Sequence, residues 1–293
     1  MPANPTLETE TATPETADGQ PIKHVVDILI EERATELRKH PFIWKMVQQY
    51  MYPVFGYQTA INLVDRVQGM SGYEVFAHLS NLLQMRVTVE GLEHLPTDGR
   101  AVIMPNHPAG IADGIAVFDA IKEIRPDMAF FANRDAVRCQ PRLDEIIIPV
   151  EWMEQRRNHA KSKETVRTML RAFKDERLIV IFASGRLAQP TLTGLKEREW
   201  LASGVSLAQR YHCPIIPMHI TGHNSLLYYL LWFLNTELKD MTLFRELLNK
   251  TNQRYHIRIG APINSAMDPE QLTPQIRQFV VNDLKHGRIE FTP

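Results

Sequence analysis

Residues 102–116 read VIMPNHPAGIADGIA, and this stretch decides which fold the chain adopts. Its apolar run ends at Met104, turn residues such as Asn106 and Gly110 follow, and a helical pattern begins near Asp113. A strand, a turn and a helix in this order form the repeating unit of an α/β fold, in which ligands bind where loops leave the carboxyl ends of strands. The stretch therefore predicts a polar site in this turn.

The rest of the chain repeats the alternation of strand and helix. Helical patterns such as residues 160–175 and 197–211 lie between short β-like runs, which favours an α/β fold with a largely parallel central sheet flanked by helices. Seven runs are strand candidates: residues 87–89, 101–104, 128–132, 146–150, 178–182, 214–220 and 256–259.

The N-terminal part follows a different pattern. Residues 21–83 are helical in pattern, with an interruption at Pro41 and a kink or break expected at Pro53 and Gly56. We expect them to form a helical N-terminal cap on one α/β domain, residues 84–293.

Composition excludes several classes of protein. The 293 residues are 44% hydrophobic and 23% charged, unlike a disordered chain, a collagen-like fibre or a disulfide scaffold. A formal net charge of −1 gives no general attraction to nucleic acid, so no nucleic-acid partner is predicted. Cys139 and Cys213 match no CxxC or zinc spacing, and we expect reduced thiols in the cytoplasm.

Residues 1–20 are rich in Pro, Thr, Glu and Ala, and they predict a disordered tail instead of a secretory signal. The nearest approach to a membrane-spanning run is LLYYLLWFL at residues 226–234, about half of the roughly 18 residues needed. It is either a buried core helix or a membrane-facing helix with Tyr228 and Trp232 at the interface. With YMYPVFGY at residues 50–57 as a second aromatic segment, we expect peripheral association with the cytoplasmic membrane.

His107 is the candidate catalytic residue of the first stretch. A histidine acts as a general base when a carboxylate holds one ring nitrogen and leaves the other free. Asp113 follows six residues later, a separation that lets a turn fold it back onto His107. The pairing suits acyl transfer in which the substrate hydroxyl, in place of a protein serine, is the nucleophile. The alternative is a helix-capping Asn106 beside a structural histidine.

The segment resembles the first motif of the glycerolipid acyltransferase superfamily, the lysophosphatidic acid acyltransferase-like enzymes, in which Asn-His precedes an aspartate. Five residues separate His107 from Asp113 where most members have four, and one branch has the NHPxxxxD pattern seen here. The resemblance covers roughly residues 84–263, and three later segments stand in the order of the family's motifs. They are FFANRDA at 130–136, IFASGRL at 181–187 and CPIIPM at 213–218.

The segment IFASGRL stands at the family's third motif and departs from its usual pattern, Phe-Pro-Glu-Gly-Thr-Arg. Ala183 replaces the proline and Ser184 replaces the glutamate, whereas Gly185 and Arg186 remain. Loss of that glutamate argues against a glycerol-3-phosphate-type acceptor. Together with residues 222–249 and 257–263, the pattern is closer to the hemolysin-like branch, which includes acyltransferases that complete ornithine lipid from its lyso precursor.

The resemblance implies an acyltransferase of membrane lipid biosynthesis. It would move a fatty acyl group from acyl-CoA or acyl-carrier protein to the hydroxyl of a lyso-lipid, either lyso-ornithine lipid or a lysophospholipid, with no bound cofactor. His107 and Asp113 would be catalytic, and the acceptor or the donor would be bound by Asn106, Arg134, Ser184, Gly185 and Arg186. The competing hypothesis is a non-catalytic lipid-binding protein that keeps this fold.

Three arginines carry the binding hypothesis, because guanidinium groups match phosphate or carboxylate oxygens. Arg186 is the strongest candidate, and Arg134 and Arg138 are weaker, with a solvated surface arginine as the alternative for each. Gly185 is expected in a turn with positive φ. Ser184 either donates to the acceptor or caps the following segment, and it lacks the GxSxG context of a nucleophilic serine.

Three histidines also stand close together in sequence, at His212, His219 and His223. Their spacing fits no standard zinc site, so no metal is predicted. His219 lies inside an apolar strand pattern, which favours a hydrogen-bonded core histidine.

Overall fold

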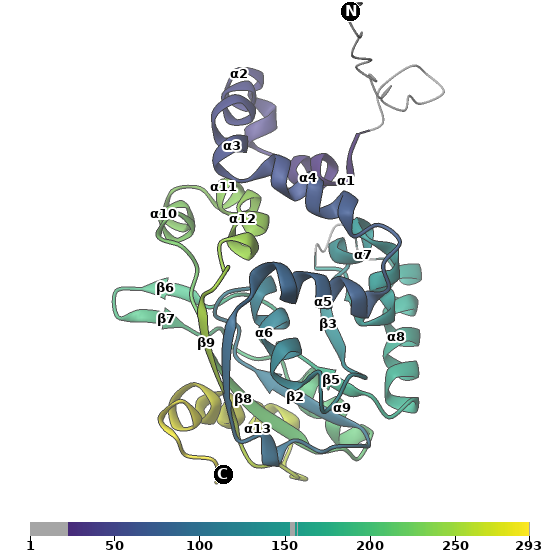
Figure 1. The fold of residues 1–293 in the computed structure, drawn as a ribbon. Coiled ribbons are helices and arrows are strands. Elements are labelled where there is room, and N and C mark those ends of the chain that lie inside the picture. The colour runs from purple at the N-terminus through teal and green to yellow at the C-terminus, as the bar shows by residue number, and fades with distance from the viewer. Residues whose placement is uncertain (1–22, 153–155, 157, 293) are drawn as a thin grey trace, which may run out of the picture.

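The computed structural model describes residues 23–152, 156 and 158–292, so the tail predicted at residues 1–20 lies outside the described part. A mostly parallel sheet occupies the centre of the molecule, with helices on both faces and a group of helices at one end (Figure 1). This arrangement confirms the α/β fold with a largely parallel sheet.

The sheet contains every strand that the sequence predicts. Its strands are, in spatial order, β1 (Arg86–Glu90), β9 (Arg254–Ile259), β8 (Ile215–Thr221), β2 (Ala101–Pro105), β5 (Leu178–Val180), β3 (Ala129–Asn133) and β4 (Ile147–Val150). All neighbours pair in parallel except β8 and β9, which are antiparallel. β2 is central and buried along its whole length, because both faces of a parallel sheet are covered by helices.

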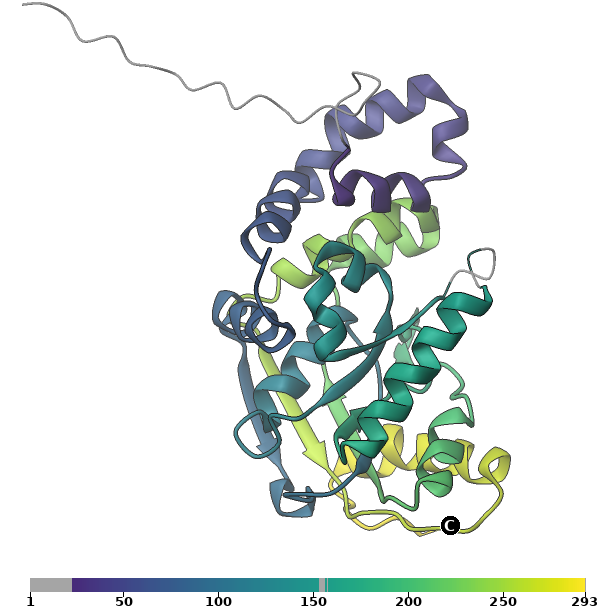
Figure 2. The same ribbon diagram turned by 90° about the vertical axis from the view of Figure 1, so that its right-hand side faces the viewer.

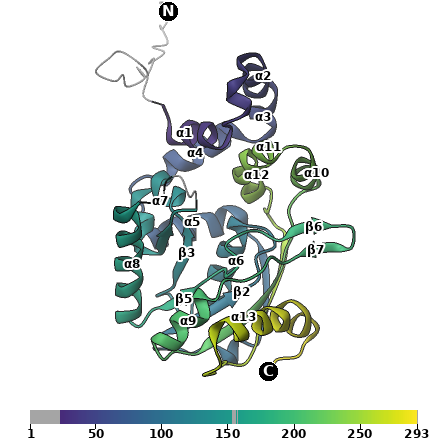
Figure 3. The same cartoon turned by 180° about the vertical axis from the view of Figure 1, so that it is seen from behind.

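Two layers of helices bury the two faces of the sheet. One layer includes α5 (Gly72–Leu83) and α6 (Ile111–Ile121), which contribute to one apolar core with the sheet. The other includes α8 (His159–Lys174), α9 (Ser203–Arg210) and α13 (Pro269–Gln278), which contribute to a second core. α7 (Asp135–Cys139) follows β3 directly, and Figure 3 shows α9 and α13 from behind.

The helix predicted at residues 197–211 is shorter than expected and begins at Ser203. Tertiary hydrogen bonds hold the first residues out of a helix: the carbonyl oxygens of Glu197 and Arg198 accept from the Arg277 guanidinium at 2.6 and 2.7 Å. The Leu201 N–H donates to the Ala183 carbonyl at 2.9 Å. The sequence also gave no sign of the hairpin before this segment, β6 (Gln189–Thr191) with β7 (Gly194–Lys196).

Short helices form the group at the end of the molecule. From the N-terminal part come α1 (Val25–Arg33), α2 (Pro41–Met46), a π turn (Val47–Met51), α3 (Tyr52–Val54) and α4 (Tyr57–Arg66). They pack on α10 (Leu226–Leu234), α11 (Thr236–Met241) and α12 (Leu243–Leu248), which follow β8 (Figures 1 and 2). Pro41 begins α2, and Gly56 breaks the chain between α3 and α4 with φ +71°, as the sequence predicts.

His219 fastens β8 to the C-terminal helical segment. Its Nδ1 lies 3.0 Å from the Val280 carbonyl, so the neutral ring donates there. Burial lowers the pKa of His219 to about 4, with a further lowering from the charges of Lys285, Arg258 and His256 and an opposing effect of the Val280 bond. His219 is therefore a hydrogen-bonded core histidine.

A depressed histidine pKa makes the folded state sensitive to acid. The contribution of His219 to the free energy of unfolding is fully present above the pKa of the unfolded chain, near 6.5. It is lost as pH falls toward 4, because His219 takes up a proton more readily in the unfolded chain than in the folded one. At pH 4 the loss is about 3 kcal/mol. We expect His219→Asn, whose amide can still donate to Val280, to lose less unfolding free energy than the parent between pH 7 and pH 4 in urea titrations. His223→Asn, on the loop after β8, should keep the parent's pH dependence; equal acid sensitivity of all three proteins would refute the assignment.

Candidate active site

The turn between β2 and α6 is organised around the carboxylate of Asp113, which is fully buried. Its Oδ2 accepts the N–H groups of Ala109 at 2.8 Å and Gly110 at 2.9 Å and lies 2.9 Å from His107 Nδ1. Asp113 is also the third residue of α6, where a negative charge meets the positive end of the helix dipole. The carboxylate thus shapes the turn and holds the histidine at once.

His107 is fixed on three sides. With Nδ1–H donated to Asp113, the imidazole exposes Nε2 as the proton acceptor. The ring stacks on Phe182, with centroids 4.2 Å apart. The main chain is held as well, because the His107 N–H donates to Glu197 Oε2 at 3.1 Å and the His107 carbonyl accepts from Ala188 N at 2.8 Å. A base in one orientation is what proton abstraction from a bound hydroxyl requires.

Asn106 has a main-chain role in this structure. Its amide nitrogen donates to the Ile220 carbonyl at 3.0 Å, and its oxygen accepts the Ile220 N–H at 2.7 Å. This pair of bonds ties the turn to β8. The alternative of a helix-capping asparagine is wrong, because Gly110 is the N-cap of α6 and its N–H donates to Asp113 Oδ2.

The third motif forms a tight turn on a cavity of about 730 Å³. Gly185 has φ +59°, as the sequence predicts, and the Ser184 hydroxyl donates to the Arg186 carbonyl at 2.7 Å. Ser184, Gly185 and Arg186 all line the cavity, and Arg186 is exposed. Three further basic side chains also line it: Lys196, Arg198 and Arg277. Two carboxylates, Glu197 and Glu199, line it as well, so the four basic side chains outnumber the acidic ones and form a cationic wall that suits an anionic group.

Comparisons with known proteins agree with this geometry. A family model described as Acyltransferase matches residues 86–221. A lyso-glycine lipid O-acyltransferase of Phocaeicola vulgatus is 23% identical over 252 residues, which are 83% of this chain and 88% of that protein. A protein of the same name from Bacteroides thetaiotaomicron is 20% identical over 205 residues, 70% and 72% of the two chains. These matches support the glycerolipid acyltransferase superfamily.

Among solved structures, this acyltransferase matches the crystal structure of the 1-acyl-sn-glycerophosphate (LPA) acyltransferase PlsC from Thermotoga maritima. The TM-score is 0.49 at 14% sequence identity, and the match covers 76% of this chain and 83% of that one.

The other two arginines of the acyltransferase lie elsewhere. Arg134 donates to Glu164 Oε2 at 2.5 Å and to the Lys161 carbonyl at 3.2 Å, so α8 holds it, and it does not line the cavity. Arg138 pairs with Glu32 at 2.7 Å and with Asp135 at 2.9 Å, which ties α7 to α1. Of the three arginines, only Arg186 lines the cavity, whereas Arg138 attaches α1 of the N-terminal cap to α7.

Glu197 is the site residue that the sequence did not reveal. It follows β7, is only 5% exposed, and reaches both His107 and the third-motif turn. Burial raises the pKa of the Glu197 carboxyl, while hydrogen bonds from the His107 N–H and the Trp200 indole oppose the rise. A carboxylate therefore lies beside Ser184 although the motif itself has none. In sequence it stands in a charged run (KEREW), typical of a solvated helix start.

The histidines raised as a metal cluster have separate surroundings. His219 is a core residue of β8, whereas His212 and His223 are exposed on loops. Within the described ranges, no group of three or more His, Cys, Asp or Glu side chains could hold a metal ion.

Replacing either member of the His107–Asp113 pair should remove most of the acyl transfer. We expect His107→Ala to lower kcat by roughly 10²- to 10⁴-fold, the usual contribution of a general base, with the fold intact. Asp113→Asn should keep somewhat more activity, because the base remains, but it should also lower the thermal midpoint, since the charge at the α6 N-terminus is lost. Steady-state kinetics and circular dichroism would check both, with the exposed His286→Ala as a matched control. A folded His107→Ala variant with the parent's turnover would disprove the role of His107.

Proposed function

We propose that this acyltransferase moves a fatty acyl group from the thioester of acyl-CoA or acyl-carrier protein to the hydroxyl of a lyso-lipid in membrane lipid biosynthesis. The 2.9 Å contact between His107 Nδ1 and buried Asp113 carries the proposal, because it leaves Nε2 free as a base. Nε2 takes the hydroxyl proton while the oxygen attacks the thioester carbonyl. A C–O bond forms, the C–S bond breaks, and the proton passes to the leaving thiolate.

The main-chain donors of the first motif have other partners in this mechanism. The N–H groups of Ala109 and Gly110 donate to Asp113, and the N–H of His107 donates to Glu197. These three N–H groups orient the base. Because they already have acceptors, they do not stabilise the oxyanion of the tetrahedral intermediate, although they are the main-chain donors of this motif.

We infer that the acceptor is a lyso-lipid with an anionic head group. The cationic wall formed by Arg186, Lys196, Arg198 and Arg277 favours a carboxylate or a phosphate. Both relatives are named lyso-glycine lipid O-acyltransferases, which supports an amino-acid lyso-lipid, the class that also contains lyso-ornithine lipid. A lysophospholipid is the competing acceptor.

Removal of Arg186 distinguishes acceptor binding from donor binding. With acyl-CoA or acyl-carrier protein as donor, we expect the parent protein to release free carrier and to acylate lyso-glycine or lyso-ornithine lipid more efficiently than lysophosphatidic acid. Arg186→Ala should raise KM for the acceptor about 10-fold or more, the effect of one charge-assisted hydrogen bond, with little change for the donor. A rise for the donor alone would place Arg186 at the carrier. Lipid binding without carrier release by the parent would favour the non-catalytic alternative.

We propose that the helical end of the molecule docks on a membrane surface. Among the described residues, no helix combines the length and the apolar character needed to cross a bilayer. Exposed apolar side chains instead form two stripes at helical spacing, which we call the docking surface: Phe42, Met46, Tyr50 and Val54 of the cap, and Leu226, Leu230, Phe233 and Leu234 of α10. α10 and the cap contribute to one apolar core, so the helices that carry the two stripes lie at the same end of the molecule (Figure 3).

The docking surface differs from the aromatic one that the sequence predicts. Tyr228 is buried, and the Trp232 ring lies between two cations, the Arg198 guanidinium at 5.5 Å and the Lys239 ammonium at 4.6 Å. The outward side chains of α10 are instead aliphatic or phenyl, such as Leu226 at 85% and Phe233 at 71% exposure, whereas Tyr50 of the second predicted segment does face outward. Burial of these groups would contribute roughly 25 cal/mol per Å² to membrane binding.

Removing three outward side chains of α10 should weaken vesicle binding without unfolding the protein. We expect Leu226→Ser, Leu230→Ser and Phe233→Ser together to reduce flotation with liposomes and activity on vesicle-borne acceptor, while activity on a short-chain soluble acceptor survives. Val166→Ser with Leu170→Ser, on the exposed face of α8, is the matched control. A folded triple variant that floats as well as the parent would exclude docking through α10.

A further inference from the structure

Glu197 is an unusual residue to bury. It is 5% exposed, and within the described ranges its carboxylate forms no salt bridge with Lys, Arg or His. Removing a carboxylate from water without a cationic partner costs several kcal/mol, and burial accordingly raises its pKa. An apolar side chain would fill the same space at lower cost. The carboxylate is therefore better explained by what it contacts than by packing.

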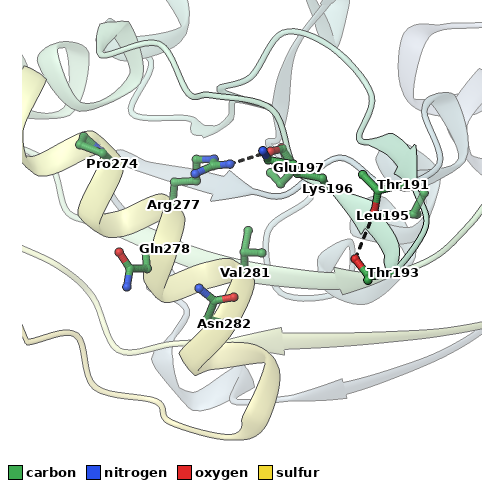
Figure 4. A pocket seen from close by; sticks show the side chains of 10 residues that line it. All are labelled: Thr191, Thr193, Leu195, Lys196, Glu197, Pro274, Arg277, Gln278, Val281 and Asn282. Carbon is green, nitrogen blue, oxygen red and sulfur yellow. Dashed lines mark hydrogen bonds between the residues drawn. The ribbon is translucent and has the colours of Figure 1, made fainter.

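Both carboxylate oxygens of Glu197 accept hydrogen bonds from neighbours of the site. Oε2 accepts the His107 N–H at 3.1 Å, and Oε1 accepts the Trp200 indole N–H at 3.1 Å. The main chain of Glu197 is fixed in turn by Arg277 of α13, which donates to its carbonyl at 2.6 Å (Figure 4). Trp200 and Arg277 thus fix the position of Glu197, and its Oε2 accepts the hydrogen bond from the main-chain N–H of His107.

A second main-chain bond holds the next peptide group of the same histidine. The His107 carbonyl accepts from Ala188 N at 2.8 Å, just after the turn of Ser184 to Arg186. His107 is therefore suspended between Ala188 and Glu197, while Asp113 holds only its ring and the turn that follows.

We propose that Glu197 is a positioning residue for acyl transfer: its carboxylate fixes the main chain of His107 against the third-motif turn and so aims Nε2 at the acceptor hydroxyl. The proposal rests on the acyl transfer proposed above. A displacement of the reacting groups by about 1 Å can cost about 10² in rate, so one peptide bond's position matters. Because Glu197 acts through the position of His107 and contacts no reacting atom, we expect its replacement to lower kcat and to leave KM nearly unchanged.

The two N–H donors make the carboxylate hard to replace. A glutamine at this position has one carbonyl oxygen, so it can accept from His107 or from Trp200, and its NH₂ then faces the other donor. Trp200→Phe removes the indole donor and leaves the glutamine oxygen free for His107. If positioning is the role, Trp200→Phe should therefore repair Glu197→Gln.

The experiment compares kcat, KM and main-chain protection in four variants. We expect Glu197→Gln to lower kcat about 10- to 100-fold with KM for acceptor and donor within about twofold, and the double variant with Trp200→Phe to recover about tenfold. The exposed Glu123→Gln should stay near the parent, and Trp200→Phe alone gives the reference kcat with which the double variant is compared. Hydrogen exchange of the His107 N–H should quicken in Glu197→Gln and slow again in the double variant.

Each outcome decides the proposal. Parent-like kcat and His107 protection in Glu197→Gln would overturn it, and so would equal loss of kcat in the single and double variants with His107 protected in both. Should Glu197→Gln fail to fold, the double variant carries the test, which requires near-parent kcat. Absence of acyl transfer by the parent would overturn the proposed function, whereas the exchange of the His107 N–H would still report on the positioning.

Discussion

One oxygen atom, Oδ2 of Asp113, joins the fold to the chemistry. It accepts two main-chain N–H groups that define the turn after β2 and faces the imidazole nitrogen of His107, all within 2.9 Å. The charge is buried where α6 begins, so the helix dipole and the three contacts of Oδ2 offset part of the hydration that the carboxylate loses, while Oδ1 has no hydrogen-bond partner among the described residues. Because one residue forms the turn, begins the helix and orients the base, changes at this position alter stability and activity together.

The parts of the structure that were predictable from sequence are those whose cause is local. Strand β2 is a continuous apolar run, which is typical of the buried interior of a parallel sheet, and His107 meets Asp113 across six residues. Glu197 could not be found in this way. It lies 90 residues from His107, and the hydrogen bonds that hold its segment extended come from Arg277, still farther along the chain. Tertiary bonds of this kind override a helical sequence pattern.

The exposed face of α10 was unpredictable for a different reason. All nine residues of the helix are apolar, so no hydrophobic periodicity distinguishes an inner from an outer face. The packing partners make that choice: Tyr228 and Leu231 are buried, and Leu226, Phe233 and Leu234 are left outside. Of the aromatic residues that looked suited to an interface, Tyr228 is buried and Trp232 is half-buried beside Arg198 and Lys239.

The position of Trp232 has a consequence for how the enzyme meets its substrate. The ring belongs to α10, and one of its two cationic neighbours, Arg198, lines the cavity beside the third motif. With α10 resting on a bilayer as proposed, the contact between Trp232 and Arg198 connects the membrane-binding helix directly to the wall of the cavity. The rate would then depend on the surface concentration of the lyso-lipid in the bilayer. Diluting the lyso-lipid with inert lipid would slow the reaction even when the total amount of lyso-lipid in the sample is unchanged.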